Sequence, residues 1–247
     1  MKQHQSPRRR RWRRIGWIAL AVPPLLVALW LLDHLRPRHA YFEERRGSIV
    51  AAEVVEDATG ANDFVSRVVH LRSTTGLRVN FRVLRPVAAE ARIPAVVVLA
   101  GHRTGSKAVE LVGDPGAVAV IALDYPYHGA EKLHGFWTVA KSLPAIQRTL
   151  LDTPPAVSLV LDWLLRQPWV DPGRVELLGA SLGTPFAAVA GARDTRFRRV
   201  WLIHGGARNR EWLGGALRHD ISNDTLRGMA ASLLHLLAHG ASFDTEY

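Results

Sequence analysis

The sequence predicts an α/β domain, a mostly parallel sheet with flanking helices, preceded by one N-terminal transmembrane helix. Residues 95–100 and 117–123 are continuous apolar runs, which is the pattern of strands buried on both faces of a parallel sheet. Residues 15–32 are 18 consecutive positions without a charged side chain. That length comes close to crossing the hydrocarbon core of a bilayer.

The amino-acid composition is that of a folded domain. The chain has 247 residues, of which 48% are hydrophobic and 22% are charged, and this excludes a disordered or fibrous chain. It contains no cysteine, which excludes disulfides, thiolate metal sites and a cysteine nucleophile. Any covalent catalysis must therefore use another side chain.

Positive charge is concentrated near the N-terminus. The net charge is +10, and residues 1–46 contain 11 lysines and arginines against three acidic residues. The other 201 residues carry 21 basic and 19 acidic side chains. A surface that follows a phosphate backbone needs a local excess of positive charge. We therefore expect no nucleic-acid partner for the main domain.

Residues 1–14 form a basic head and residues 15–32 the membrane anchor. Six arginines precede the span and two follow it, which predicts a cytoplasmic N-terminus and a main domain outside the cytoplasm, as in a bacterial-type inner membrane. A cleaved signal peptide would need an A-x-A pattern after the apolar run, where the sequence reads LLDHLRPRHA. A twin-arginine signal lacks a clean local pattern, and the flanking arginines argue against a buried core helix.

Residues 33–47 are polar and are expected to form a stalk, and residues 48–247 form the domain. Its first strands alternate in polarity around a Thr75-Gly76 turn, which predicts antiparallel edge strands. Later strands and helices alternate, which predicts parallel strands with right-handed crossovers. The expected strands are residues 48–56, 65–73, 77–84, 95–100, 117–123, 174–178 and 200–203, and the expected helices are residues 155–167, 182–192, 211–217 and 225–237.

A serine motif follows the strand expected at residues 174–178. Residues 179–183 read Gly-Ala-Ser-Leu-Gly, a G-x-S-x-G pattern between a buried strand and a helix. A nucleophile on such a turn has a strained backbone, needs glycine neighbours and lies at a helix N-terminus, where the dipole favours developing negative charge. Ser181 is therefore the candidate nucleophile. The alternative is a turn in which Ser181 only caps the helix.

From about residue 94 to residue 206 the chain resembles the α/β-hydrolase superfamily. The matching segments are residues 101–105 (GHRTG), 124–129 (DYPYHG) and 179–183 (GASLG). They resemble, in order, the oxyanion loop, the D-x-x-G-H-G-like turn and the nucleophile elbow of that family. The superfamily includes esterases, lipases, peptidases, thioesterases and non-catalytic relatives, so the resemblance narrows the reaction class more than the substrate.

The resemblance also implies roles for single residues. The oxyanion donors would be the backbone N–H groups of Leu182 and His102, and His128 would be structural. The family's acid and histidine follow later strands, which this sequence does not predict. The chain therefore ends where they are expected, either as an incomplete copy of a longer hydrolase or as a shortened protein without a base. The general base and acid are unknown, and the candidates in the correct chain order are Asp220 or Asp224 with His235 or His239.

Histidines downstream of Ser181 also allow other interpretations. His235 and His239 are four residues apart and would share one helix face, as two metal ligands do. No glutamate lies between them, so an interfacial helix face is the preferred interpretation and no metal is predicted. His204 follows the last expected strand and is either a substrate contact or a structural residue. No cofactor is predicted.

These features predict a membrane-anchored serine hydrolase that cleaves an ester or related acyl bond through an acyl-enzyme on Ser181. Its substrate would be a small-molecule or lipid-like acyl compound, and residues 209–247 would form a cap over the site. Two alternatives remain open: a catalytically inactive binding module of the same fold, or a peptidase of that fold.

Overall fold

The structure is a computed structural model that divides the chain into two compact units, residues 1–37 and residues 38–247. It describes residues 21–29, 32, 39–59, 64–87, 92–101, 104–129, 136–205, 217–218 and 221–232.

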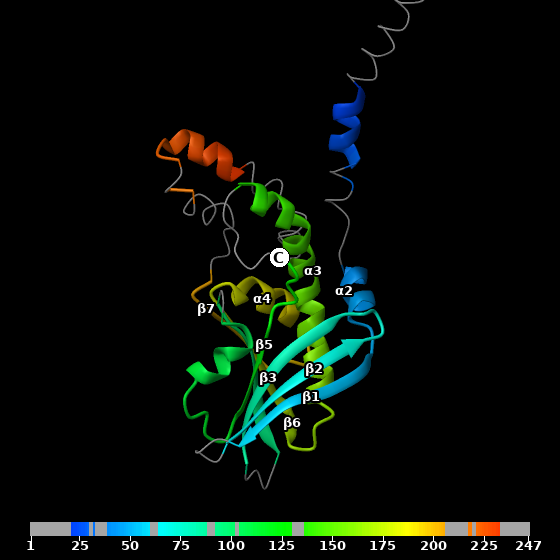
Figure 1. Cartoon of the computed structure of the whole chain (residues 1–247), viewed down its shortest axis with the longest axis vertical. Coiled ribbons are helices and arrows are strands. Elements are labelled where there is room, and N and C mark those ends of the chain that lie inside the picture. The colour runs from blue at the N-terminus through cyan, green and yellow to red at the C-terminus, as the bar shows by residue number, and fades with distance from the viewer. Residues whose placement is uncertain are drawn as a thin grey trace, which may run out of the picture. The chain divides into compact units, whose positions relative to one another are not determined.

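A seven-stranded sheet forms the centre of the second unit (Figure 1). Its strand order is β1-β2-β3-β5-β4-β6-β7. The strands are β1 (Ile49–Thr59), β2 (Phe64–Ser73), β3 (Arg78–Pro86), β4 (Ile93–Leu99), β5 (Ala119–Leu123), β6 (Val170–Ala180) and β7 (Val200–Ile203). The helices are α2 (His39–Arg46), the 3₁₀ helix η1 (Gly105–Leu111), α3 (Phe136–Leu164) and α4 (Gly183–Arg193).

The sheet is mixed, whereas the sequence predicted a mostly parallel one. β1, β2, β3 and β5 pair antiparallel, and β5, β4, β6 and β7 pair parallel. The antiparallel β1–β3 hairpins predicted from alternation are confirmed, and Gly76 has the positive φ of +76° that the turn between β2 and β3 requires. The half of the sheet that carries the serine motif is the parallel half.

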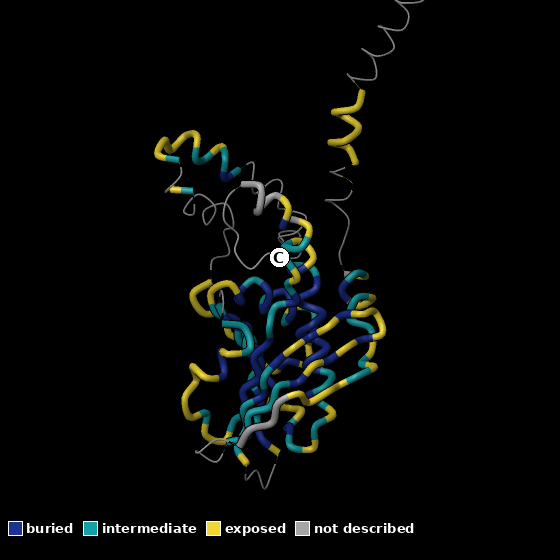
Figure 2. Tube along the Cα trace, in the orientation of Figure 1, coloured by how far each residue is buried: buried dark blue, intermediate teal, exposed yellow. Residues whose placement is uncertain are grey.

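Helices cover the two faces of the parallel strands. On β5, Ala119, Ile121 and Leu123 pack into the core that α3 and α4 share, whereas Val120 and Ala122 pack against Ala108 and Val109 of η1. Successive side chains of a strand point to opposite faces, so a strand covered on both faces must be apolar throughout. Figure 2 shows the buried residues gathered between the sheet and α3. The buried strands predicted from apolar runs are thus confirmed.

Helix α3 begins 19 residues before the helix that the sequence predicted at residues 155–167, and it contains Pro144, Pro154 and Pro155. A proline in a helix interior costs roughly 3 kcal/mol, because it removes a hydrogen bond and clashes with the preceding turn. Val157, Leu159, Val160 and Leu161 follow the two adjacent prolines and are fully buried. Each contributes roughly 1.5–3 kcal/mol on burial, which is enough to offset the prolines.

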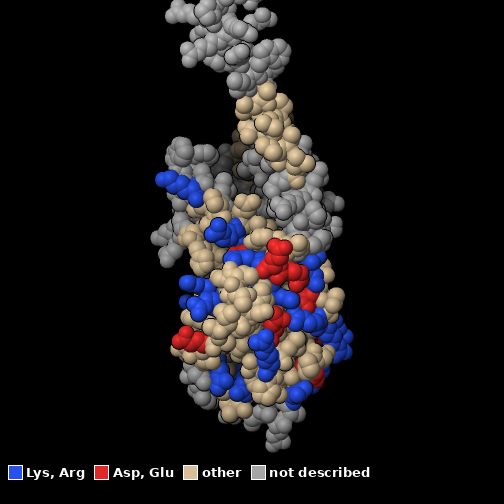
Figure 3. Space-filling view, turned by 90° about the vertical axis from the view of Figure 1, so that its right-hand side faces the viewer, with Lys and Arg blue, Asp and Glu red and all other residues tan. Residues whose placement is uncertain are grey.

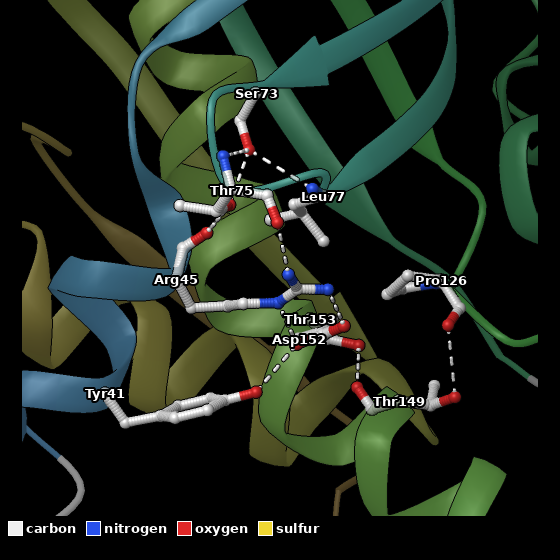
Figure 4. Close-up of polar contacts among 9 residues, drawn as sticks. All are labelled: Tyr41, Arg45, Ser73, Thr75, Leu77, Pro126, Thr149, Asp152 and Thr153. Carbon is white, nitrogen blue, oxygen red and sulfur yellow. Dashed lines mark hydrogen bonds and ion pairs between the residues drawn. The ribbon is translucent and has the colours of Figure 1, made fainter.

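Helix α2 docks on α3, although its residues were expected to belong to a stalk. Phe42 is only 4% exposed and joins the core of the sheet. The Arg45 guanidinium donates two hydrogen bonds of 2.7 Å to the carboxylate of Asp152 on α3, and the Tyr41 hydroxyl donates a third of 2.9 Å (Figure 4). Burial, followed by the charge of Asp152 and this hydrogen bond, raises the pKa of Tyr41 to about 12. These contacts hold the chain entering β1 against α3.

The N-terminal unit is described only over residues 21–29 and 32, which are helical. Several of their large apolar residues, among them Leu25, Leu26 and Val27, are more than half exposed. Within the described ranges no helix is both long and apolar enough to span a bilayer. The rest of the predicted span, residues 15–20 and 30–31, lies outside the described residues, as do residues 211–216 of the helix predicted at residues 211–217. Leu217 is described and lies in a turn. Residues 224–232 are helical, and residues 225–232 of them belong to the helix predicted at residues 225–237.

Candidate active site

Ser181 occupies a tight turn between β6 and α4, where the sequence predicts a nucleophile. Its φ is +52°, in the left-handed region that side chains other than glycine rarely adopt. β6 ends at Ala180 and α4 begins at Gly183, so the turn consists of Ser181 and Leu182 alone. The Ser181 side chain is exposed at the N-terminus of α4. This is the strained, projecting backbone that an activated serine requires.

Gly179 and Gly183 of the motif have no room for a side chain. A Cβ on Gly179 would lie 2.5 Å from the Ala187 Cβ and 2.6 Å from the Gly183 carbonyl oxygen. A Cβ on Gly183 would overlap the carbonyl group of Leu99 at the end of β4. Both clashes arise because α4 crosses directly over β4 and β6. The G-x-S-x-G spacing is therefore a consequence of close packing, which a turn that merely caps a helix does not need.

Strand β7 fixes the turn from the other side. The Ser181 N–H donates to the Ile203 carbonyl at 2.9 Å, and the Thr184 hydroxyl donates to the same oxygen at 3.2 Å. Ala180 is paired with Ile203 in the parallel register, so His204 takes the next position, beside Ser181. His204 also has a positive φ, +51°, and is exposed. Among the residues that the structure describes, Ser181 and His204 are the only ones other than glycine with positive φ.

The loop after β4 reaches the serine. A Cβ on Gly101 would lie 3.6 Å from the Ser181 Cβ and 3.9 Å from its Oγ. The Tyr125 hydroxyl donates to the Ala100 carbonyl at 2.5 Å, and its ring packs against Phe186 of α4 at 5.4 Å between centroids. Burial raises the pKa of Tyr125, so this phenol stays a neutral donor.

Asp124 anchors the other end of the same loop. The Ser106 N–H donates to its Oδ1 at 2.7 Å, and Gly105, with φ of +48°, packs directly against that oxygen. Asp124 therefore accepts from the start of η1, and is a structural acid. Through Asp124 and Tyr125, the three segments that resemble hydrolase motifs meet at one end of the sheet. Sequence reasoning did not single out Tyr125, because nothing local shows that its hydroxyl reaches a carbonyl 25 residues away.

A potential oxyanion donor lies next to the serine. Leu182 is the N-cap of α4, with φ −57° and ψ −30°, and no acceptor is bonded to its N–H among the residues described. The first N–H groups of a helix lack partners within the helix and lie at the positive end of its dipole. Leu182 can thus donate to an oxygen bound beside Ser181. The second predicted donor, His102, lies outside the described residues, immediately after Gly101.

Most of the candidate base and acid residues fall outside the described residues: Asp220, His235 and His239. Asp224 is described, at the start of the helix over residues 224–232, where its exposed carboxylate pairs with Arg227. Among the histidines in the described ranges, His204 is the one that the register places next to Ser181.

Asp194 is the first acidic residue after Ser181 in the sequence, and its role is structural. Arg196 donates to both of its carboxylate oxygens, at 2.7 and 2.6 Å, and also to Asp162 of α3 at 2.7 Å. Burial alone would raise the pKa of Asp194, but the hydrogen bonds from Arg196 and Ser158 and the charge of Arg196 lower it below the ordinary value. Asp194 therefore ties the end of α4 to α3.

No family model matches this sequence, and no curated protein matches it. Several solved structures, however, are similar to this chain. Acetyl xylan esterase 1 from Thermoanaerobacterium sp. JW/SL YS485 superposes with a TM-score of 0.55 and 16% identity, over 83% of this chain and 72% of the esterase. Acetyl xylan esterase from Paenibacillus sp. R4 gives a TM-score of 0.55 and 14% identity, over 83% and 73%. With the mixed sheet and the elbow at Ser181, this similarity shows that the chain has the α/β-hydrolase fold.

Proposed function

We propose that this protein is a membrane-anchored serine hydrolase that cleaves an ester bond with Ser181 as nucleophile. The observation that carries the proposal is the left-handed backbone of Ser181 between two glycines that have no room for a side chain. A φ of this kind costs on the order of 1–3 kcal/mol and persists at sites where the strain serves the chemistry. A turn that only capped a helix would have no reason to keep it.

The reaction would proceed by acyl transfer. The Ser181 Oγ attacks the carbonyl carbon of the ester, and the carbonyl oxygen becomes an oxyanion that accepts from the Leu182 N–H and from the backbone of the loop after Gly101. The alcohol then leaves, and water releases the acid from Ser181. A base must take the Ser181 proton, and His204, His235 and His239 are the candidates to test. The chemistry needs no metal or cofactor.

The membrane part of the proposal is supported by the sequence of residues 1–32 and by the exposed apolar side chains of residues 21–29. On the face of the molecule in Figure 3, acidic side chains lie among the basic ones, which suits a small-molecule substrate better than a nucleic acid. Because two solved structures of this fold are acetyl xylan esterases, an activated acetyl ester is the first substrate to try.

The decisive experiment labels the full chain, in membranes, with a fluorophosphonate probe, which reacts with an activated serine and hardly with an ordinary hydroxyl. We expect labelling of the natural protein, none of Ser181→Ala, and unchanged labelling of Ser48→Ala, which alters an exposed serine at the start of β1. Asparagine variants of His204, His235 and His239 then identify the base.

Three results would contradict the proposal. Labelling that survives Ser181→Ala would place the reactive group elsewhere. A folded natural protein that neither labels nor hydrolyses p-nitrophenyl acetate would favour the inactive binding module, and turnover of anilides at a rate similar to that of esters would favour the peptidase.

A further inference from the structure

A second concave site lies on the face of the sheet that carries η1. It is a groove of about 610 Å³ at the C-terminal end of β5, and the hairpin strands β1, β2 and β3 form its floor. Its lining includes Glu53, His70, Arg72, Arg78, Asn80 and His128. The groove shares Asp124 and Tyr125 with the loop beside the candidate active site, but its polar hairpin side chains lie on β1, β2 and β3, and β5 and β4 separate β3 from β6 and the turn at Ser181.

Strand register explains why these polar side chains gather there. Val69 and Leu71 of β2 and Val79 and Phe81 of β3 point into the core, so the residues between them face the opposite way. Two rows result. Glu53, His70 and Asn80 are paired across the three strands, and next to them Arg72 is paired directly with Arg78.

The pairing of Arg72 with Arg78 is unfavourable for the isolated protein. Side chains directly opposite on antiparallel strands have Cβ atoms roughly 4.5–5.5 Å apart, and like charges at that distance destabilise the sheet. In the described part of the chain neither arginine has an ion-pair or hydrogen-bond partner. The one acidic side chain on the adjacent loop, Asp124, is already bonded to Ser106.

Three other arginines of the same domain are paired with acidic side chains. Arg45 is paired with Asp152, Arg174 with Asp171, and Arg196 with Asp194 and Asp162. The groove thus contains two exposed arginines that are directly opposite each other on β2 and β3. A planar guanidinium fork matches the geometry of carboxylate and phosphate groups, and two of them converge on one anion.

We propose that this groove binds a small hydroxylated oxyanion, with its carboxylate or phosphate group held between Arg72 and Arg78. The row of Glu53, His70 and Asn80 lies beside the arginines and offers acceptors and donors for hydroxyl groups of the same molecule. A sugar acid and a sugar phosphate share this chemistry. Anion binding in this groove does not involve Ser181, so the two proposals can be tested independently.

The test is calorimetric titration of the full chain in detergent, at constant ionic strength, with inorganic phosphate, glucuronate and glucose. We expect both anions to bind and glucose not to bind, with the carboxylate and phosphate arms showing which anion is preferred. Arg72→Gln/Arg78→Gln should weaken anion binding at least about tenfold, whereas Arg166→Gln, an exposed arginine after α3, should leave it unchanged. Glu53→Gln should weaken binding of glucuronate but not of phosphate.

The double variant also gives a readout without ligand. Its thermal midpoint should equal or exceed that of the natural protein, because the repulsion between the arginines is removed. Unchanged anion affinity in the double variant, or no binding of either anion to the natural protein, would overturn the proposal. So would an equal loss of affinity in Arg166→Gln, which would indicate general charge attraction.

Discussion

At the scale of single residues, Ser181 combines chemistry with backbone strain, and the two are separable. Its hydroxyl is the proposed nucleophile, while its φ of +52° is a property of the turn that any residue at this position must adopt. Glycine adopts that φ without steric cost, whereas alanine does not.

We therefore expect Ser181→Ala and Ser181→Gly to be equally inactive but different in stability. Ser181→Gly should have a free energy of unfolding about 1 kcal/mol higher than Ser181→Ala, measured by urea denaturation. At Ser48, whose φ is not positive, the order should reverse, since glycine there only adds freedom to the unfolded chain. Equal stability of the two Ser181 variants would show that the turn carries no strain.

Asp194 gives a residue-scale prediction for pH. Its folded-state pKa lies below its unfolded value of about 3.8, so its contribution to stability is present above the unfolded pKa and is lost as the pH falls through the folded pKa. The free energy of unfolding should decline below about pH 5, and Asp194→Asn should be less stable at pH 7 yet lose less on acidification. Urea denaturation at pH 7 and at about pH 2, below the unfolded pKa, checks this, and an equal loss of stability in both proteins would refute it.

At the scale of elements, the predictions from sequence succeed where one face or both faces of a strand are apolar. The runs at residues 95–100 and 117–123 became β4 and β5, and β7 lies at the residues predicted, because burial on both faces leaves a continuous apolar signature. The start of α3 was missed because prolines normally end helices, and only the burial of its later turns offsets them. Helix α2 was missed because its docking depends on Asp152, more than a hundred residues away.

The features of the candidate site also divide into those that a short segment predicts and those that depend on distant parts of the chain. The turn at Ser181 and its two glycines were predicted from the five residues 179–183 and the strand and helix beside them, because the elbow depends on residues that are close together in the sequence. The position of His204 beside Ser181 depends on the β6–β7 register, and the bond from Tyr125 to Ala100 depends on the order of strands. The sequence predicts that His204 follows a strand near the serine, as a substrate contact or a structural residue. No short segment indicates the bond of Tyr125, which was not predicted.

Helix α2 is the element whose attachment is easiest to test. Arg45→Met keeps the apolar stem but leaves the carboxylate of Asp152, a residue only 3% exposed, without its cation. We expect a loss of about 2–4 kcal/mol in the free energy of unfolding, reduced because Arg45 itself is partly exposed. Adding Asp152→Asn should restore part of the loss by removing the buried charge.

The matched control is Arg174→Met, which breaks the exposed pair with Asp171 and should cost far less stability than Arg45→Met, because solvent screens the pair. If Arg45→Met costs no more than this control, Phe42 and the hydrogen bond of Tyr41 hold α2 and the ion pair contributes nothing measurable.

At the scale of the whole molecule, the open question is attachment to a membrane. The full chain should sediment with membranes and resist extraction at alkaline pH, and deletion of residues 2–32 should release the domain in folded form. Protease added to spheroplasts should digest the domain but not the arginine-rich head. Extraction of the full chain by carbonate alone would contradict the anchor.

The docking of α2 has a mechanical consequence for a tethered domain. β1 is an edge strand paired only with β2, and a pull on a bare edge strand opens its hydrogen bonds one after another. Here the chain reaches β1 only after Phe42 and Arg45 have fastened α2 to α3. If residues 1–32 anchor the domain as proposed, tension through them would reach α3, the longest helix among the described residues, before it reached β1. Several contacts would then have to break at once, and the sheet that carries Ser181 would be shielded from the load.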